Sequence, residues 1–186
     1  MNLLEMLMSA GGNSAVGQLG NRFGLDENQT MAALQQLVPA LGNGLQRNVA
    51  QEGGLESLLG ALANGNHSQY IDNPELLDSE STYQEGNGIL GHLLGSKDAS
   101  RAVAAQASEQ TGIGSDILKQ MLPVVATMVM GSLSKQSTQA GYLGGQDAPA
   151  QPEGLLGMLT PLLDSNRDGS AVDDVIGMLG RFMKNR

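Results

Sequence analysis

The sequence contains no cysteine and no tryptophan, and aromatic residues make up only 3% of its 186 residues. Without cysteine the chain forms no disulfide framework and performs no thiol chemistry. With so few aromatic rings, the hydrophobic core must be built from leucine, valine, alanine and methionine, a composition that suits helices. The ten methionines either fill gaps in that core or form an adaptable binding surface.

Positive charge is also scarce, because 10 Lys and Arg residues stand against 19 Asp and Glu, which gives a net charge of −9. The basic residues are scattered singly until residues 181–186, which argues against a nucleic-acid partner. The two histidines, His67 and His92, do not have the spacing of zinc ligands. The N-terminal residues Met1–Ala10 carry Glu5 and no basic residue, unlike a secretory signal. We therefore expect a cytoplasmic, acidic protein.

The segment Gly114–Gln136 is the most apolar in the chain, with fifteen uncharged residues between Lys119 and Lys135. A helix that is apolar nearly all round must be covered on most sides by other protein. Four residues interrupt the apolar run: Pro123, Thr127, Gly131 and Ser132. We judge the segment too short and too interrupted for a membrane span, which needs roughly 20 apolar residues. The sequence therefore predicts the buried central helix of an all-α domain.

Two similar patterns indicate two related helix-turn-helix-like units. Residues 23–25 (Phe-Gly-Leu) lead to Leu-Val-Pro at 37–39, and residues 111–113 (Thr-Gly-Ile) lead to Met-Leu-Pro at 121–123. In each unit the glycine permits the left-handed conformation that ends a helix. The predicted organisation is a helical unit at 1–65, an acidic linker at 66–87, a second helical unit at 88–137, a Gly/Gln/Pro linker at 138–153, and a C-terminal helical hairpin at 154–186.

The first of these units contains a candidate DNA-recognition helix at Asp26–Val38. Asp26 and Gln29 form a predicted capping box at its start, and Pro39 is expected to end or kink the helix. A recognition helix presents amides and cations to DNA. This one offers amides but no cation, with Glu27 beside its start. The pattern favours a helical hairpin packed into a bundle, and a DNA-binding regulator is the alternative.

A candidate calcium site lies in the loop of the predicted C-terminal hairpin, between helices at 155–163 and 171–183. Its proposed ligands carry side-chain oxygens: Asp164, Asn166, Asp168, Ser170, Asp173 and Asp174. Oxygen ligands at positions one, three and five, followed by glycine at six, are typical of an EF-hand-like loop. The twelfth position is Val175 instead of glutamate, so Asp173 or Asp174 would have to complete the coordination.

A second interpretation of this loop needs no ion. Ser170 and Asp173 form a capping box for the last helix, and the Asp168–Gly169 pair makes a turn by itself. Both interpretations stay open. If calcium binds, it fixes the angle of the hairpin by neutralising the repulsion among the aspartates.

Enzymatic signatures are weak. Gly86–Gly91 matches the dinucleotide fingerprint by its letters, but no buried strand precedes it and no βαβ pattern surrounds it. No serine lies in a nucleophile elbow. The sequence therefore predicts no catalytic and no nucleotide-binding residues, and we expect a protein that is not an enzyme.

The chain resembles the YidB-like family of bacterial proteins, domain of unknown function 937. The resemblance is carried by Leu37–Pro39, Leu122–Pro123, Gly88–Gly95 (GILGHLLG) and Leu162–Met183. It implies an all-helical fold with homeodomain-like units and brings no established activity. The function we expect is a non-enzymatic protein-interaction or self-assembly module whose partner is another protein or a second copy of the chain. The Met-, Leu- and Gly-rich short helices would supply the contact.

Overall fold

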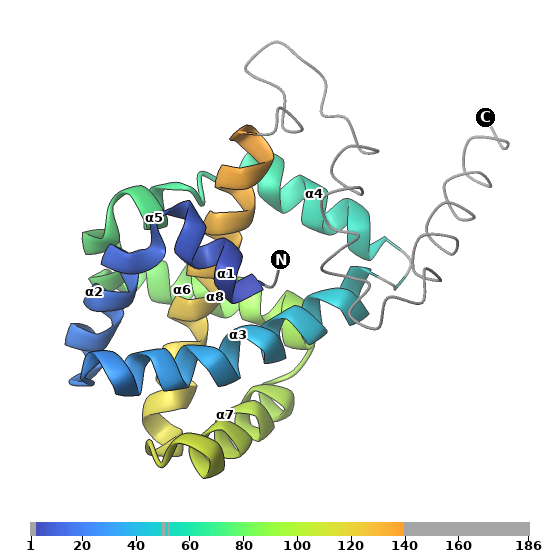
Figure 1. The fold of residues 1–186 in the computed structure, drawn as a ribbon. Helices are drawn as coiled ribbons and strands as arrows, with labels where there is room; N and C mark the ends of the chain where they lie inside the picture. Colours follow the sequence, from blue (N-terminus) through green and yellow to red (C-terminus); the bar gives the residue numbers. More distant parts are fainter. Residues whose placement is uncertain (1–2, 50, 52, 140–186) are drawn as a thin grey trace, which may run out of the picture.

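The computed structural model describes residues 3–49, 51 and 53–139 (Figure 1). Within these residues the protein is all-α and contains no strand. The elements in order are α1 (Leu3–Leu7), the π-helical η1 (Met8–Gly12), α2 (Asn13–Phe23), α3 (Glu27–Val49), α4 (Gly54–Asn64), α5 (Gln69–Asp72), the 3-10 helix η2 (Pro74–Asp78), α6 (Glu80–Leu94), α7 (Lys97–Thr111) and α8 (Ser115–Gln139). The predicted all-α class is thus confirmed for this part of the chain.

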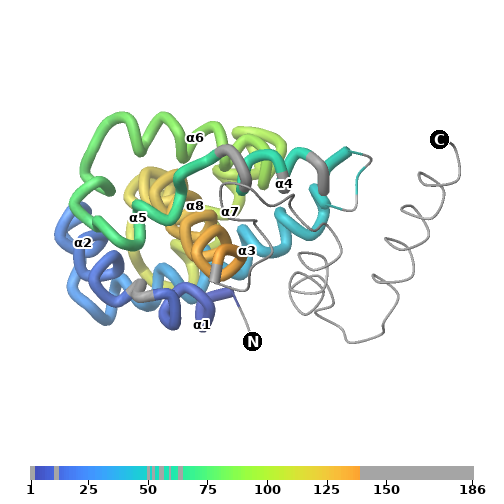
Figure 2. Tube along the Cα trace, turned by 90° about the horizontal axis from the view of Figure 1, so that it is seen from above, coloured from blue at the N-terminus to red at the C-terminus, as the bar shows by residue number. Residues whose placement is uncertain are grey.

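Helix α8 is the centre of the molecule. Figure 2 shows it running between α6 on one side and α1 on the other, and it contacts all seven other α-helices and η1. Every residue from Met121 to Ser134 is buried. Such a helix needs no polar face because protein surrounds it. The predicted central helix is confirmed.

Helix α8 is longer than the sequence suggested. Residues Ser115–Thr138 are long and apolar enough to cross a membrane by length and composition, so the prediction that the segment is too short was wrong. The helix runs on through Pro123 and Gly131 without a break. In this structure 83% of its apolar stretch is buried inside the protein, as in the core helix of a globular fold.

The two predicted helix–turn–helix pairs are present as α2–α3 and α7–α8. Gly24 and Gly112, with φ of 67° and 72°, occupy the left-handed turn position in each pair. Buried side chains recur at equal distances from the two glycines: Leu34 and Leu122, Leu37 and Val125, Leu41 and Val129, Leu45 and Leu133. In α3 these positions form one buried face, whereas α8 buries every residue from Met121 to Ser134, so the shared positions do not by themselves make the two helices alike. Their likeness to homeodomains stays a prediction.

Pro39 does not end α3, which continues to Val49. The proline is exposed, and the buried face of the helix is carried past it by Val38, Leu41 and Leu45. A proline in a helix interior costs a hydrogen bond and strains the preceding turn. Here the apolar face on both sides of Pro39 keeps the helix together.

The stretch 66–87, predicted to be a mobile acidic linker, instead forms α5, η2 and the first half of α6. Its apolar residues Tyr70, Ile71 and Leu77 are buried in the core. Ser79 caps α6 by accepting a hydrogen bond from the backbone N–H of Thr82 at 3.2 Å. These three buried side chains hold the stretch against the core. The acidic side chains do not oppose this packing because they lie on the outside, in water. The predicted linker at 138–153 and the C-terminal hairpin at 154–186 lie outside the described residues, except for residues 138 and 139 in α8.

Candidate functional site

The predicted calcium ligands, Asp164, Asn166, Asp168, Ser170, Asp173 and Asp174, all lie outside the described residues. Within the described part of the chain, no group of three or more His, Asp or Glu residues is placed to hold a metal ion. The C-terminal loop stays a candidate metal site predicted from sequence.

The glycine-rich match to the dinucleotide fingerprint, Gly86–Gly91, lies wholly within α6. A dinucleotide fingerprint needs a strand, a tight turn and then a helix N-terminus. Gly86 is buried against α8, while Gly88 and Gly91 have no atoms nearby for a side chain to meet. Gly86 allows α6 to pack closely on α8, whereas Gly88 and Gly91 lie on the surface of α6. None of the three forms a phosphate-binding turn.

Helix α3 presents the amides expected of the candidate recognition helix. The side chains of Asn28, Gln29, Gln35 and Gln36 are exposed. The predicted capping box is confirmed: the backbone N–H of Gln29 donates to the Asp26 carboxylate at 2.8 Å, and the Gln29 side chain accepts from the Asp26 N–H at 3.1 Å. The cap places two acidic side chains, Asp26 and Glu27, at the start of the helix. These two carboxylates would repel the phosphates of a DNA backbone that approached the start of α3.

The structure adds a polar cluster that the sequence did not suggest, in which the buried rings of His67 and Tyr70 meet the exposed carboxylate of Glu85. His67 is 5% exposed and Tyr70 is 4% exposed. The Nε2 of His67 lies 3.1 Å from the carbonyl oxygen of Ala61, which can only accept, so this nitrogen carries the hydrogen. The Nδ1 lies 2.9 Å from Oε1 of Glu85 but makes no well-aligned hydrogen bond. The other carboxylate oxygen of Glu85 accepts from the Tyr70 hydroxyl.

Glu85 thus bridges two buried rings from the α5 region to α6. Burial, followed by the hydrogen bond to Glu85 and the negative charge of Glu85, raises the pKa of Tyr70 to about 12. A tyrosine held neutral in this way is a hydrogen-bond donor and a poor nucleophile or base. The cluster also packs closely on the central helix: a Cβ on Gly131 of α8 would lie 2.6 Å from the His67 carbonyl oxygen. This arrangement fits a structural tie between helices.

Sequence reasoning missed this cluster because its members have no motif spacing. Glu85 is separated from His67 by α5, η2 and the start of α6. Only the folding of residues 66–87 against α8 brings the three side chains together, and that stretch was predicted to be a linker. The one available signal was the presence of Tyr70 and Ile71 in an otherwise acidic stretch.

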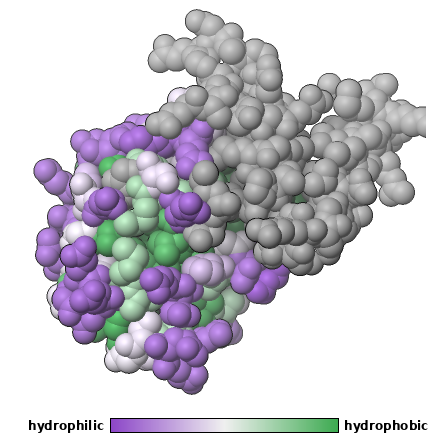
Figure 3. All heavy atoms as spheres, viewed as in Figure 1, coloured by the Kyte–Doolittle hydropathy of each residue, from purple (hydrophilic) through white to green (hydrophobic). Residues whose placement is uncertain are grey.

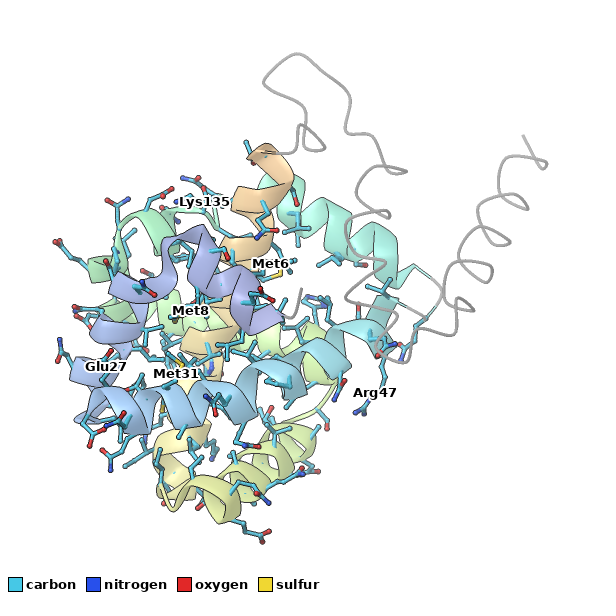
Figure 4. The ribbon with its side chains drawn as sticks, in the orientation of Figure 1. Met6, Met8, Glu27, Met31, Arg47 and Lys135 are labelled. Carbon is cyan, nitrogen blue, oxygen red and sulfur yellow. The ribbon has the colours of Figure 1, made fainter. Side chains whose placement is uncertain are left out.

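The face formed by η1 and α3 carries an apolar surface. Figure 3 shows apolar atoms gathered in the middle of this face and bordered by hydrophilic side chains. Figure 4 places Met8, from η1, and Met31, from α3, on the same face, with Glu27 one helical turn before Met31. Both methionines are half-buried, whereas Met6 of α1 is 3% exposed. We call the surface formed by Met8 and Met31 the methionine patch.

The described residues thus define an all-helical protein with a buried central helix, a polar tie between helices and an apolar patch on one face. The chain belongs to the family of bacterial proteins of unknown function (DUF937), whose model matches residues 5–136. The match begins in α1 and ends within α8, so it covers nearly the whole described bundle and confirms the resemblance seen in the sequence. No curated protein and no solved structure matches the chain.

Proposed function

We propose that this protein is a non-enzymatic interaction module that associates with a second copy of itself through the methionine patch. The observation that carries the proposal is the position of Met8 and Met31 on one face, only partly buried and bordered by hydrophilic side chains (Figures 3 and 4). Methionine side chains are flexible and polarisable, and they adapt to the surface that they meet. A central apolar patch with a polar rim is the usual anatomy of a protein interface.

Two features of the chain suit this proposal. The polar cluster of His67, Tyr70 and Glu85 ties helices together and offers no activated nucleophile, since the pKa of Tyr70 is raised to about 12. The net charge of −9 repels nucleic acid, and it also repels a second copy of the chain, so self-association must rest on apolar contact. Specific contact between two copies would then depend on the apolar side chains of the methionine patch.

The experiment is light scattering of the full chain across the micromolar range, on the wild type and on two matched variants. Met31→Asp places a charge in the patch, while Gln84→Asp places the same side chain at an exposed site on α6, outside the patch. The wild type and Gln84→Asp are expected to show concentration-dependent dimers that Met31→Asp abolishes. A wild type that stays monomeric throughout, or a Met31→Asp variant that dimerises as well as Gln84→Asp, contradicts the proposal.

The second part of the proposal is a weak calcium site at Asp164–Asp174. Its support is the oxygen-rich loop between two predicted helices, with Gly169 at the position of the sharp turn. Calcium binding would fix the angle between those two predicted helices. It would thereby determine which side chains of residues 155–183 a partner can contact.

The alternative function, a DNA-binding regulator, is favoured by one observation, the exposed amides of Asn28, Gln29, Gln35 and Gln36 on a helix that follows a tight turn. The carboxylates of Asp26 and Glu27 at the start of that helix oppose it. A mobility shift with mixed duplex DNA at low salt separates the two functions. Any shift that Gln35→Ala and Gln36→Ala remove would favour DNA binding over the interaction module.

A further inference from the structure

Residues 155–183 of this chain contain more apolar surface than they can bury alone. The predicted helix at 171–183 carries one apolar stripe at helical spacing: Val172, Val175, Ile176, Leu179, Phe182 and Met183. The segment 155–183 is well below about 40 residues, the size under which a fold usually needs disulfides, a metal or another protein surface. With no cysteine in the chain, disulfides are excluded. Apart from the calcium ion proposed for the loop at 164–174, the remaining support for this stripe is a surface supplied from outside the segment.

The methionine patch offers a surface of matching chemistry. It is apolar at Met8 and Met31, and Glu27 stands beside it on α3 (Figure 4). The last six residues of the chain carry three cations, Arg181, Lys184 and Arg186, and no acid. The first 139 residues carry about twice as many acidic as basic side chains. A helix whose apolar stripe ends in a cluster of cations thus fits an apolar patch on an acidic domain.

The linker makes an intramolecular contact favourable. Helix α8 ends at Gln139, and the residues up to 154 span up to about 50 Å when extended. A bundle of this length has a radius of gyration of roughly 14 Å, so the segment can reach any face of it. A connection of this length within one chain gives an effective concentration on the order of millimolar, well above that of a second molecule in a micromolar solution.

We propose that residues 171–183 pack their apolar stripe on the methionine patch of the same chain, with the cationic end beside Glu27. The segment then competes with a second copy for the patch and limits self-association. This regulatory role rests on the proposed function, because both contacts use Met8 and Met31. The intramolecular contact itself does not depend on self-association.

Engineered cysteines test the contact directly, because the chain has none of its own. The full-length double variant Met31→Cys/Leu179→Cys is oxidised mildly and analysed by non-reducing electrophoresis and peptide mass spectrometry. The matched control is Gln84→Cys/Leu179→Cys, with its first cysteine at an exposed position on α6, outside the patch. The expected result is a disulfide within one chain that forms at least about tenfold faster in the patch variant, since contact raises the effective concentration of the two thiols.

The other outcomes separate this inference from the proposed function. A disulfide between two chains overturns the intramolecular contact while supporting self-association through the patch. Equal rates in the two double variants overturn the contact, and light scattering of Met31→Asp then decides the proposed function independently.

A second measurement avoids any change in the helical bundle. In full-length protein with labelled methionine methyl groups, Ile176→Asp is expected to shift the Met8 and Met31 resonances and to leave the buried Met121 and Met128 unchanged. Unchanged Met8 and Met31 resonances would overturn the proposal, because the variant alters only the segment that is meant to cover them.

Discussion

Gly86 of α6 lies directly against Pro123 of α8. A Cβ built on Gly86 would come within 2.2 Å of the Pro123 carbonyl oxygen and 2.6 Å of its carbonyl carbon. No side chain fits at such a distance from backbone atoms, so the two helices cross here only because residue 86 is glycine. The crossing joins the central helix to α6, the helix that also carries Glu85 of the polar cluster.

Gly86→Ala is therefore expected to lower the free energy of unfolding by about 2–3 kcal/mol, because the helices must separate to admit the methyl group. Gly88→Ala is the matched control, two residues further along the same helix, where nothing lies within 4 Å of the added Cβ. It is expected to stabilise the protein by about 0.5–1 kcal/mol through helix propensity. Urea unfolding followed by circular dichroism measures both. Equal effects of the two substitutions would contradict the close crossing.

The capping box at the start of α3 gives a second prediction. Asp26→Ala removes the acceptor of the Gln29 N–H and is expected to cost about 1 kcal/mol of stability. Gln36→Ala, at an exposed site in the same helix, is the control and is expected to change stability by less than about 0.5 kcal/mol. Thermal unfolding of the three proteins side by side reports the difference. A loss for Gln36→Ala as large as that for Asp26→Ala would show that the cap contributes nothing specific.

The raised pKa of Tyr70 predicts a loss of stability at high pH. The folded state holds the neutral hydroxyl up to a pKa of about 12, whereas the unfolded chain ionises near the ordinary value of 10.0. The contribution of Tyr70 is therefore fully present below pH 10 and is lost as the pH rises through 12. The loss across this window is on the order of 2 kcal/mol.

Tyr70→Phe is the control for that window, because phenylalanine has no proton to lose. The difference in unfolding free energy between the wild type and Tyr70→Phe, measured by urea at several pH values, is expected to narrow steadily from pH 10 to 12. A difference that stays constant over these pH values would show that the Tyr70 hydroxyl is not held neutral by burial and Glu85.

Calcium titration of the full chain tests the C-terminal loop. Isothermal calorimetry on the wild type is expected to show weak binding, and Asp164→Ala/Asp168→Ala is expected to abolish it because two of the predicted carboxylate ligands are gone. Glu75→Ala/Glu80→Ala, which removes two exposed acids from the helical bundle, is the matched control for net charge. Absence of heat in the wild type, or equal heat in both double variants, would leave the loop as a capped turn without an ion.

The central helix, the paired helix turns and the capping box could all be predicted from sequence because each depends on local pattern. A run of fifteen uncharged residues needs cover on every side, and Gly24 and Gly112 mark turns by their backbone freedom. The polar cluster and residues 66–87 could not be predicted in this way. Their structure depends on contacts with α8, such as that between His67 and Gly131, which no spacing in the sequence reveals. The sequence suggested only that some methionines form a binding surface. Which methionines do so depends on how η1 and α3 are placed in the bundle, and local pattern does not show this.

Hydrogen exchange of the full chain tests the central claim most directly. If α8 is the wrapped centre of the bundle, the amides of Met121–Leu133 exchange only on global unfolding, and they are the slowest among residues 3–139. Exposed amides of α7, such as those of Ala105 and Gln106, exchange much faster. Exchange in Met121–Leu133 as fast as in α7, or protection there only when lipid vesicles are added, would contradict the account.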